Sequence, residues 1–232
     1  MKLPLLLSVP HAGLTIPPEA KPYCRLTSDD VMRDSDEGAA QIYNLAEHVD
    51  RFVTTDVARA IVDLNRAESD RTADGVVKTH TCWSVKVYDC FPPEEVVEQL
   101  LCLYYRPYHE RLEEGYIESV RLGLDCHTMA QVGPPVGPDA GKARPLVCLG
   151  DARGTTLPAG WMDCLTGCFL RAFDGDVKVN EPFAGGYITR THGKRRPWVQ
   201  VELSREPSFS MDEKRERVLR ALEEFCTETF GP

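Results

Sequence analysis

Two histidines follow apolar segments that the sequence predicts to be buried strands. His11 comes directly after residues 3–10 (LPLLLSVP), and His127 comes directly after residues 122–126 (LGLDC). Strand ends that open onto a crevice are where open α/β sheets bind their ligands, and imidazole is the commonest metal-binding side chain. Two such histidines with one carboxylate would form a zinc site that leaves one coordination position free.

Asp125 stands two residues before His127, so on an extended strand both side chains point to the same face. A carboxylate in that position commonly accepts the second ring N–H of a metal-binding histidine and fixes its tautomer. Cys126 points to the opposite face, which disfavours a cysteine nucleophile paired with a histidine. The other alternative is that Asp125 and His127 merely close a turn.

The carboxylate ligand is left open among three acidic residues that lie just before a predicted helix. These residues are Asp34, Asp36 and Glu37. Acidic residues at a helix start more commonly cap the helix or complement its dipole. We favour Asp36 as the metal ligand, with Asp34 and Glu37 as the alternatives.

A second polar group surrounds the apolar residues 60–64, which we predict to be a strand. Arg59 stands at its start, and Asn65 and Arg66 follow its end. The planar guanidinium of arginine suits a carboxylate or a developing oxyanion. A surface salt bridge is the more ordinary role for a lone arginine.

Residues 198–203 (WVQVEL) alternate between apolar and polar, so Gln200 and Glu202 share one face of a predicted strand. A glutamate on an interior face needs a partner or a function. Beside a metal-bound water, Glu202 would serve as the general base. The alternative is an edge strand whose polar face is solvated.

Residues 180–189 (NEPFAGGYIT) are rich in turn-forming residues and match no phosphate-binding loop. We expect this segment to cover a substrate, with contacts from Asn180 and Tyr187. Gly185 and Gly186 would let the backbone approach the substrate closely. Beyond this segment, His192 is a further candidate site residue, and the basic residues 194–196 are expected to form a solvated loop.

Strands and helices alternate among the elements that must position these residues. Strands are predicted at 3–9, 52–55, 60–64, 122–126, 145–149, 177–179 and 197–203, with a β-rich excursion at 76–88 and a loop at 133–143. Helices are predicted at about 35–49, 92–122, 157–173 and 211–230, the second kinked or divided by Pro107. This alternation indicates one α/β domain over residues 1–232, with a sheet between helices.

Composition excludes several classes of function. The 232 residues are 42% hydrophobic and 27% charged, as in ordinary globular proteins. A net charge of −9 and a pI near 5.2 argue against a nucleic-acid partner. The apolar run 3–9 is too short to span a membrane. The nine irregularly spaced cysteines are expected to be reduced thiols, as in a cytoplasmic protein. The oligomeric state is left open.

Taken together, these segments resemble the N-formylglutamate amidohydrolase family. The matching segments are 8–13 (SVPHAG), 36–39 (DEGA), 63–66 (DLNR), 106–109 (RPYH), 125–129 (DCHTM), 150–151 (GD), 180–189 (NEPFAGGYIT) and 199–202 (VQVE). Their order along the chain fits the family, and they cover nearly its full length. Each motif is modest, whereas the ordered set is fairly specific.

The resemblance implies an α/β three-layer sandwich similar to zinc carboxypeptidases and aspartoacylase, with a mixed, mostly parallel sheet between helices. It also implies one zinc ion bound by His11, Asp36 and His127. Carboxypeptidase-like relatives carry a glutamate three residues after the first histidine. Leu14 stands at that position here, so the carboxylate ligand must come from elsewhere.

By the same resemblance, Arg59 would stabilise the oxyanion, and Asn65 and Arg66 would bind a substrate carboxylate. Glu202 would be the general base. The implied reaction is attack by a metal-bound water on the amide of a small N-acyl amino acid such as N-formylglutamate. Two alternatives are a non-catalytic ligand-binding protein on the same scaffold and a carboxypeptidase-like metallopeptidase.

Overall fold

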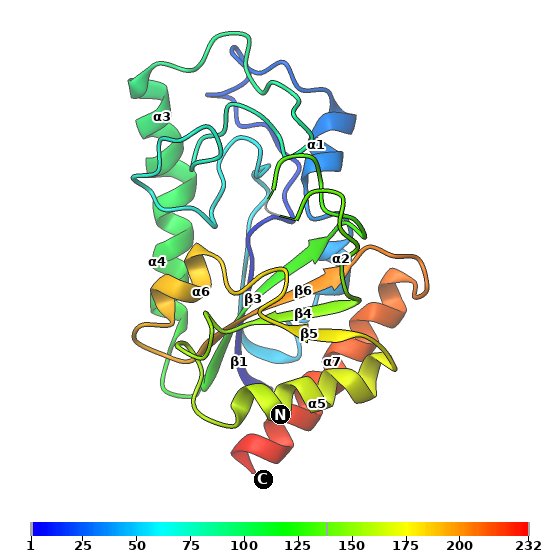
Figure 1. Ribbon diagram of the computed structural model, residues 1–232. Helices are drawn as coiled ribbons and strands as arrows, with labels where there is room; N and C mark the ends of the chain where they lie inside the picture. Colours follow the sequence, from blue (N-terminus) through cyan, green and yellow to red (C-terminus); the bar gives the residue numbers. More distant parts are fainter. Residues whose placement is uncertain (1, 138, 232) are drawn as a thin grey trace.

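A mixed six-stranded sheet forms the centre of the computed structural model, which describes residues 2–137 and 139–231 (Figure 1). The termini 1 and 232 of the expected domain, and residue 138 of the expected loop, lie outside the described residues. The strands are β1 (Leu3–Val9), β2 (Val49–Thr54), β3 (Leu122–Met129), β4 (Val147–Gly150), β5 (Val177–Val179) and β6 (Trp198–Ser204), in the order β2-β1-β3-β6-β4-β5. All neighbouring strands are parallel except β4 and β6, which are antiparallel.

Helices cover both faces of this sheet. They are α1 (Ser28–Asp34), α2 (Ala39–Ile42), α3 (Glu94–Leu100), the π-helical segment η1 (Leu101–Tyr105), α4 (Arg106–Gly115), α5 (Trp161–Phe173), α6 (Tyr187–His192) and α7 (Met211–Phe230). In β1, Leu5 and Leu7 belong to a core shared with α2, α5 and α7, whereas Leu6 belongs to a second core shared with α3 and α4. The period-2 alternation of a strand produces these two cores, and the predicted α/β architecture with a sheet between helices is confirmed.

The prediction of a helix over 35–49 is wrong. That stretch contains only the four-residue α2, which begins after Gly38 in the left-handed conformation, with φ of 81°. The helix in this region is α1, which ends directly before residue 35. Its capping box, in which Thr27 and Asp30 each accept a hydrogen bond from the other's backbone N–H, follows a pattern readable in the sequence. Residues 35–38 therefore form an irregular connection, in which Ser35 and Asp36 are buried.

The predicted strand over 60–64 and the β-excursion over 76–88 are also wrong. Residues 60–64 form buried turns, and residues 76–88 contain isolated bridges rather than ladders. The apolar side chains of both segments fill the second core, on the α3–α4 side of the sheet. Short apolar runs do not by themselves distinguish a strand from a buried turn.

The predicted helix over 92–122 ends at Gly115, and Pro107 does disturb it. Proline has no N–H to donate and its ring crowds the carbonyl one turn earlier. The helix accommodates this with the wide turn η1, which lies directly before α4, and continues instead of dividing.

Three further differences bear on the site. β3 continues to Met129, so His127 lies inside the strand and not at its end. β6 lies between β3 and β4, so the alternative of a solvated edge strand for Glu202 is wrong. Residues 187–192 form α6, a helix that the turn-rich composition of its surroundings did not predict.

Among the described residues, no helix is both long enough and apolar enough to cross a bilayer.

Candidate metal centre and catalytic cavity

The register of the central strands brings the predicted polar residues side by side. His127 pairs with Glu202 across β3 and β6, and Asp125 pairs with Gln200 in the same way. All four point to the α3–α4 side of the sheet, because the alternate residues of both strands fill the opposite core. The shared faces predicted for Asp125 with His127 and for Gln200 with Glu202 are confirmed by a contact within each pair.

Two imidazole nitrogens and one carboxylate oxygen converge next to this row. His11, just past the end of β1, places Nδ1 3.6 Å from Oδ2 of Asp36, and His127 places Nδ1 2.8 Å from the same oxygen. The three ligand atoms lie within 4.8 Å of one another, and all three residues are buried. A set of two imidazole nitrogens and one carboxylate oxygen is typical of catalytic zinc sites with an open position.

His11 shows most directly that this cluster fits a cation. Its Nε2 lies 2.8 Å from Oδ1 of Asp63, and because a carboxylate only accepts, Nε2 carries the proton. Nδ1 is then a buried lone pair with no hydrogen-bond partner among the described residues. A buried acceptor without a partner is costly unless a ligand satisfies it.

His127 lies closer to negatively charged carboxylates than an ordinary buried histidine does. Its Nε2 lies 3.0 Å from Oδ1 of Asp125 and 3.1 Å from the amide nitrogen of Asn65. Burial lowers the pKa of His127, but the neighbouring Asp125, Asp36 and Glu202 outweigh burial and raise it well above its ordinary value. A cation bound at Nδ1 would take the place of the proton there.

Among the three acidic candidates, the structure brings Asp36 to the two histidines. Burial raises the pKa of Asp36, but His11 and His127 together have a larger, opposite effect, so this pKa lies well below the ordinary range. Asp34 instead accepts a hydrogen bond at 2.8 Å from the backbone N–H of Cys82. Glu37 is exposed.

Arg59 directs the free oxygen of Asp36 toward the histidines. Its Nη1 lies 3.1 Å from Oδ1 of Asp36, which leaves Oδ2 for the histidines, and its Nη2 lies 3.6 Å from Oδ2 of Asp63. Arg59 also lines the cavity in front of the cluster. Its predicted role as the oxyanion group stays a prediction.

Lys78 is a residue of this site that the sequence analysis missed. It is 2% exposed, its Nζ lies 3.0 Å from Oδ2 of Asp63, and it also pairs with Asp74. Lys78 thereby keeps Asp63 charged beside His11, and the pKa of Asp63 lies well below its usual range although burial opposes this. A lysine in the polar segment 78–81 gives no sign in the sequence that it will be buried.

Glu202 is buried next to the cluster. Burial, the largest effect, raises the pKa of its carboxyl, and the charge of His127 partly opposes this. Nε2 of Gln200 donates to Oε1 of Glu202 at 2.6 Å. The other amide atom of Gln200, Oε1, has no partner among the described residues.

Both polar atoms of the Asn65 side chain form hydrogen bonds within the protein. Its Oδ1 accepts the backbone N–H of Ile188 at 2.8 Å, which fixes the amide so that Nδ2 faces Asp125 at 3.1 Å. A Cβ on Gly186 would lie 2.2 Å from Nδ2 of Asn65. The close approach that we predicted for Gly186 is therefore made by the side chain of Asn65.

The other predicted substrate residues divide into two groups. Arg66 and Gly185 line the cavity, and Arg66 also binds Oδ2 of Asp74 at 2.7 Å. The side chain of Asn180 binds Asp151 at 2.9 Å, and Tyr187 packs against His109. Neither Asn180 nor Tyr187 is among the described residues that line the cavity. Their substrate contacts stay predictions, and their bonds indicate positioning roles.

The cavity in front of the cluster has a volume of about 360 Å³ and is rich in arginine. Arg190, from α6, and Arg205, just after β6, line it and were not predicted. Nε of Arg205 is buried without a hydrogen-bond partner among the described residues. Cys126 lies in the opposite core, as predicted, and His192 lines a different cavity.

Comparison with known proteins finds relatives in sequence and in fold. A curated relative, N-formylglutamate deformylase of Pseudomonas putida, is 27% identical over 221 residues, which cover 88% of this chain and 80% of the relative. The crystal structure of N-formylglutamate amidohydrolase from Ralstonia eutropha JMP134 has a TM-score of 0.75 at 21% identity, and the match covers 97% of this chain and 90% of that one. A gene product of Agrobacterium tumefaciens has the same TM-score of 0.75 at 17% identity, over 99% of this chain and 91% of that one. These two likenesses show a shared fold.

The N-formylglutamate amidohydrolase family profile matches residues 3–207, which include all the residues of the cluster and its cavity. The chain belongs to the N-formylglutamate amidohydrolase family.

Proposed function

We propose that this protein is a metal-dependent hydrolase that removes the acyl group of a small N-acyl amino acid, N-formylglutamate above all. The observation that carries the proposal is the convergence of His11, Asp36 and His127 beside Glu202, in a cavity lined by arginines. The family and the name of the Pseudomonas putida relative support the acyl group and the amino acid.

His11, Asp36 and His127 would bind one divalent cation, and zinc suits these donors. Such an ion lowers the pKa of a water molecule and polarises a carbonyl oxygen. Asp63 and Arg59 keep His11 and Asp36 oriented for binding.

Glu202 would move the proton. It takes a proton from the water that attacks the amide carbon, and it returns that proton to the amine nitrogen as the C–N bond breaks. The products are the free amino acid and a small acid, which is formate when the acyl group is formyl. The raised pKa of Glu202 suits a group that must both accept and donate a proton near neutral pH.

The arginines would bind the substrate carboxylates. Arg205 and Arg190 line the cavity and form no salt bridge with described residues, whereas Arg66 is already paired with Asp74. Guanidinium groups bind carboxylates through paired, charge-assisted hydrogen bonds. We therefore assign Arg205 and Arg190 to carboxylate binding, with Arg66 at the rim, and Asn65 to positioning Asp125 and His127.

A substrate panel tests this proposal. The zinc-loaded protein is assayed with N-formyl-L-glutamate, N-acetyl-L-glutamate, N-formyl-L-leucine and glutamate-containing tripeptides. We expect the highest kcat/KM for N-formyl-L-glutamate and a kcat lower by about 10²–10⁴-fold for the Glu202→Gln variant. Preferred cleavage of the tripeptides would favour a metallopeptidase. Binding of N-formyl-L-glutamate without turnover by the metal-loaded protein would favour a non-catalytic binding protein.

A further inference from the structure

A second cavity, of about 350 Å³, lies between the end of α4 and the segment that follows α6. We call it the α4–α6 cavity; the residues that matter below are Glu113, Tyr116, His192, Arg195, Arg196 and Trp198. It shares no lining residue with the catalytic cavity. Trp198 starts β6, so this cavity lies near the opposite end of the strand from Glu202.

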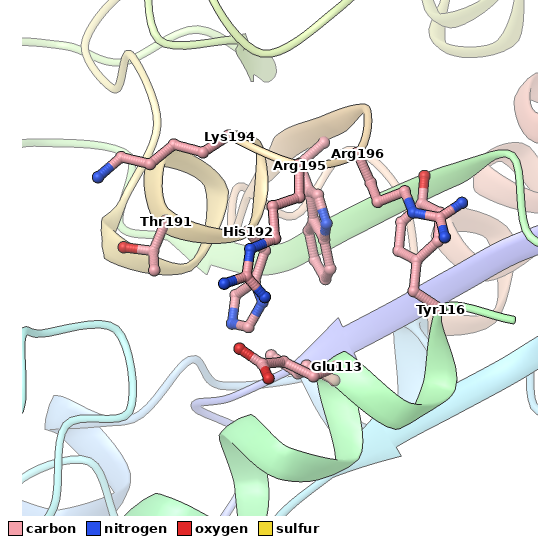
Figure 2. A pocket seen from close by; sticks show the side chains of 9 residues that line it. Glu113, Tyr116, Thr191, His192, Lys194, Arg195 and Arg196 are labelled. Atoms are coloured by element: carbon pink, nitrogen blue, oxygen red, sulfur yellow. The ribbon is translucent and has the colours of Figure 1, made fainter.

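The charge of the α4–α6 cavity is opposite to that of the whole chain. Arg195 and Arg196 line it, and no carboxylate of the described residues forms a salt bridge with either of them. Figure 2 shows Arg195 and His192 directed toward Glu113, and Arg196 beside Tyr116. The guanidinium carbon of Arg196 lies 5.0 Å from the Tyr116 ring centre, which orients its N–H groups.

The guanidinium groups of Arg195 and Arg196 outnumber the single carboxylate of Glu113, so the cavity has an excess of positive charge. Aromatic rings form part of its wall. The indole of Trp198 is 1% exposed and packs 5.4 Å from His192, so the inner wall is rigid and apolar. Guanidinium groups in such a setting bind phosphate and carboxylate oxygens in pairs. The ligand chemistry that fits is a small dianion.

A chain of contacts joins this cavity to the catalytic one. Nε2 of His192 lies 3.1 Å from Nδ1 of His109, and Nε2 of His109 lies 3.0 Å from the carbonyl oxygen of Leu64. Because that carbonyl only accepts, His109 donates from Nε2, so neutral His109 accepts from His192 at Nδ1. Leu64 directly precedes Asn65, which lies against Asp125 and His127.

α6 makes the same link through the backbone. His192 is its last residue; Arg190, in the same last turn, and Gly186, which precedes the first residue, line the catalytic cavity. The backbone N–H of Ile188 donates to Asn65, and Thr189 Oγ1 lies 3.4 Å from Oδ2 of Asp125. A shift of this six-residue helix would therefore move contacts of Asn65 and Asp125 together.

We propose that the α4–α6 cavity is a second binding site, for a small dianion, and that α6 transmits its occupancy to the catalytic cavity. The dianion is a phosphate group or a dicarboxylate. The transmission to turnover rests on the proposed function, whereas the binding site does not.

Fluorine NMR of the zinc-loaded protein labelled with 5-fluorotryptophan tests the site. The three tryptophans report separate places: Trp198 the α4–α6 cavity, Trp83 the catalytic cavity, and Trp161 the packing of α5 against α7. Inorganic phosphate and, separately, succinate are titrated at constant ionic strength. We expect the Trp198 resonance to shift and saturate with one of the two, which identifies the group, while Trp161 stays in place.

The double variant Arg195→Gln/Arg196→Gln should weaken this binding about tenfold or more. The matched control is Arg25→Gln/Arg215→Gln, which removes the same charge from an exposed and a half-buried arginine that already have carboxylate partners. If the Trp198 resonance of Arg195→Gln/Arg196→Gln still shifts and saturates at the same anion concentration, the proposed site is wrong. The site is also wrong if, with both anions, only the Trp83 resonance shifts, or neither the Trp83 nor the Trp198 resonance shifts.

Turnover of N-formyl-L-glutamate, measured with and without the saturating anion, tests the link. We expect kcat/KM to change in the wild-type protein and not in Arg195→Gln/Arg196→Gln. Saturation at Trp198 with unchanged turnover would overturn the transmission through α6. If the protein hydrolyses none of the acyl amino acids, the proposed function fails, and the tryptophan titration still decides the site.

Discussion

The two metal-site histidines differ in how their distal ring nitrogens are supported. His11 has a single short contact to Asp63, which Lys78 and Arg59 keep charged from its other side. Nε2 of His127 lies 3.0 Å from Oδ1 of Asp125, and Asn65 donates to the other oxygen of that carboxylate. The orientation of His11 therefore depends on one carboxylate, and that dependence can be tested.

Asp63→Asn should weaken metal binding by about 10–100-fold, the usual effect of losing a carboxylate behind a metal-binding histidine. The amide offers His11 a weaker acceptor and leaves Lys78 without its buried partner. Zinc affinity is measured by competition with a chromophoric chelator. Asp56→Asn, at an exposed aspartate, is the control, and equal zinc affinity in both variants would remove Asp63 from this role.

Glu202→Gln should keep the metal and lower kcat by about 10²–10⁴-fold, the typical contribution of a general base. The amide preserves the size of the side chain and its contact with Gln200 but cannot accept the proton. Metal content by mass spectrometry and steady-state kinetics check both parts. The exposed Glu216→Gln serves as the control. Normal turnover by Glu202→Gln would assign the proton transfer to another group.

Arg205→Met should raise KM for N-formyl-L-glutamate about tenfold or more with a much smaller change in kcat. The buried Nε of Arg205 has no partner among the described residues, so a substrate carboxylate is the acceptor that we expect there. The backbone bond from Arg205 to Met129 is kept in the variant. An unchanged KM, with Arg215→Met as the reference, would contradict carboxylate binding by Arg205.

At the scale of elements, β3, β6 and α6 position the site together. The parallel register of β3 and β6 aligns His127 with Glu202, and α6 lies against Asn65 and against Asp125 of β3. Gly186 allows this packing, because its backbone, with φ of −76°, would accept any residue, yet a Cβ there would meet Asn65. The demand for glycine at this position is thus steric.

Gly186→Ala should lower Tm by roughly 2–10 °C, since overpacking of this kind costs about 1–3 kcal/mol. It should also reduce turnover, because α6 or Asn65 must move. Gly167→Ala, inside α5, is the matched control. The Cβ there meets just the far end of the long Arg171 side chain, and alanine favours a helix, so stability should stay the same or rise. Equal Tm values for both variants would show that α6 can shift to accommodate the added Cβ at no cost in stability.

At the scale of the whole molecule, the metal centre ties distant parts of the chain to one another. Its ligands come from the residues just past the end of β1, from the connection before α2, and from β3. The buried carboxylates of Asp36, Asp63, Asp125 and Glu202 surround two histidines, and a bound cation would balance their charge. Folding stability should therefore depend on the metal.

Chelation should lower Tm by about 5–10 °C. Metal present at 100 times its Kd stabilises the folded state by about 2.7 kcal/mol, and each kcal/mol shifts Tm by about 2–4 °C for a chain of this size. Calorimetry with and without a chelator, followed by addition of zinc, measures the loss and its recovery. His127→Ala should show a much smaller response to chelator. A Tm that is insensitive to chelation in the wild-type protein would argue against a metal centre.

The sequence by itself determined the strands that hold the site and the faces of their side chains. The two-residue spacing of Asp125 and His127 at the predicted strand 122–126, and the alternation along 198–203, place Asp125 with His127 and Gln200 with Glu202, because a strand has a fixed period of two. The 20-residue α7 matches the predicted range 211–230, since its capping box and apolar periodicity are local. The family motifs indicated the chemistry before any contact was known.

The tertiary structure alone decided which irregular segments meet at those strands. Asp34, Asp36 and Glu37 are equivalent in local sequence, and Asp36 is distinguished because the connection before α2 brings its side chain beside His11 and His127. Lys78, Arg205 and the α4–α6 cavity likewise arise from contacts between residues far apart in the chain. Turns and loops have no period, so the side chains that they bury are set by the packing of the whole fold and not by local sequence.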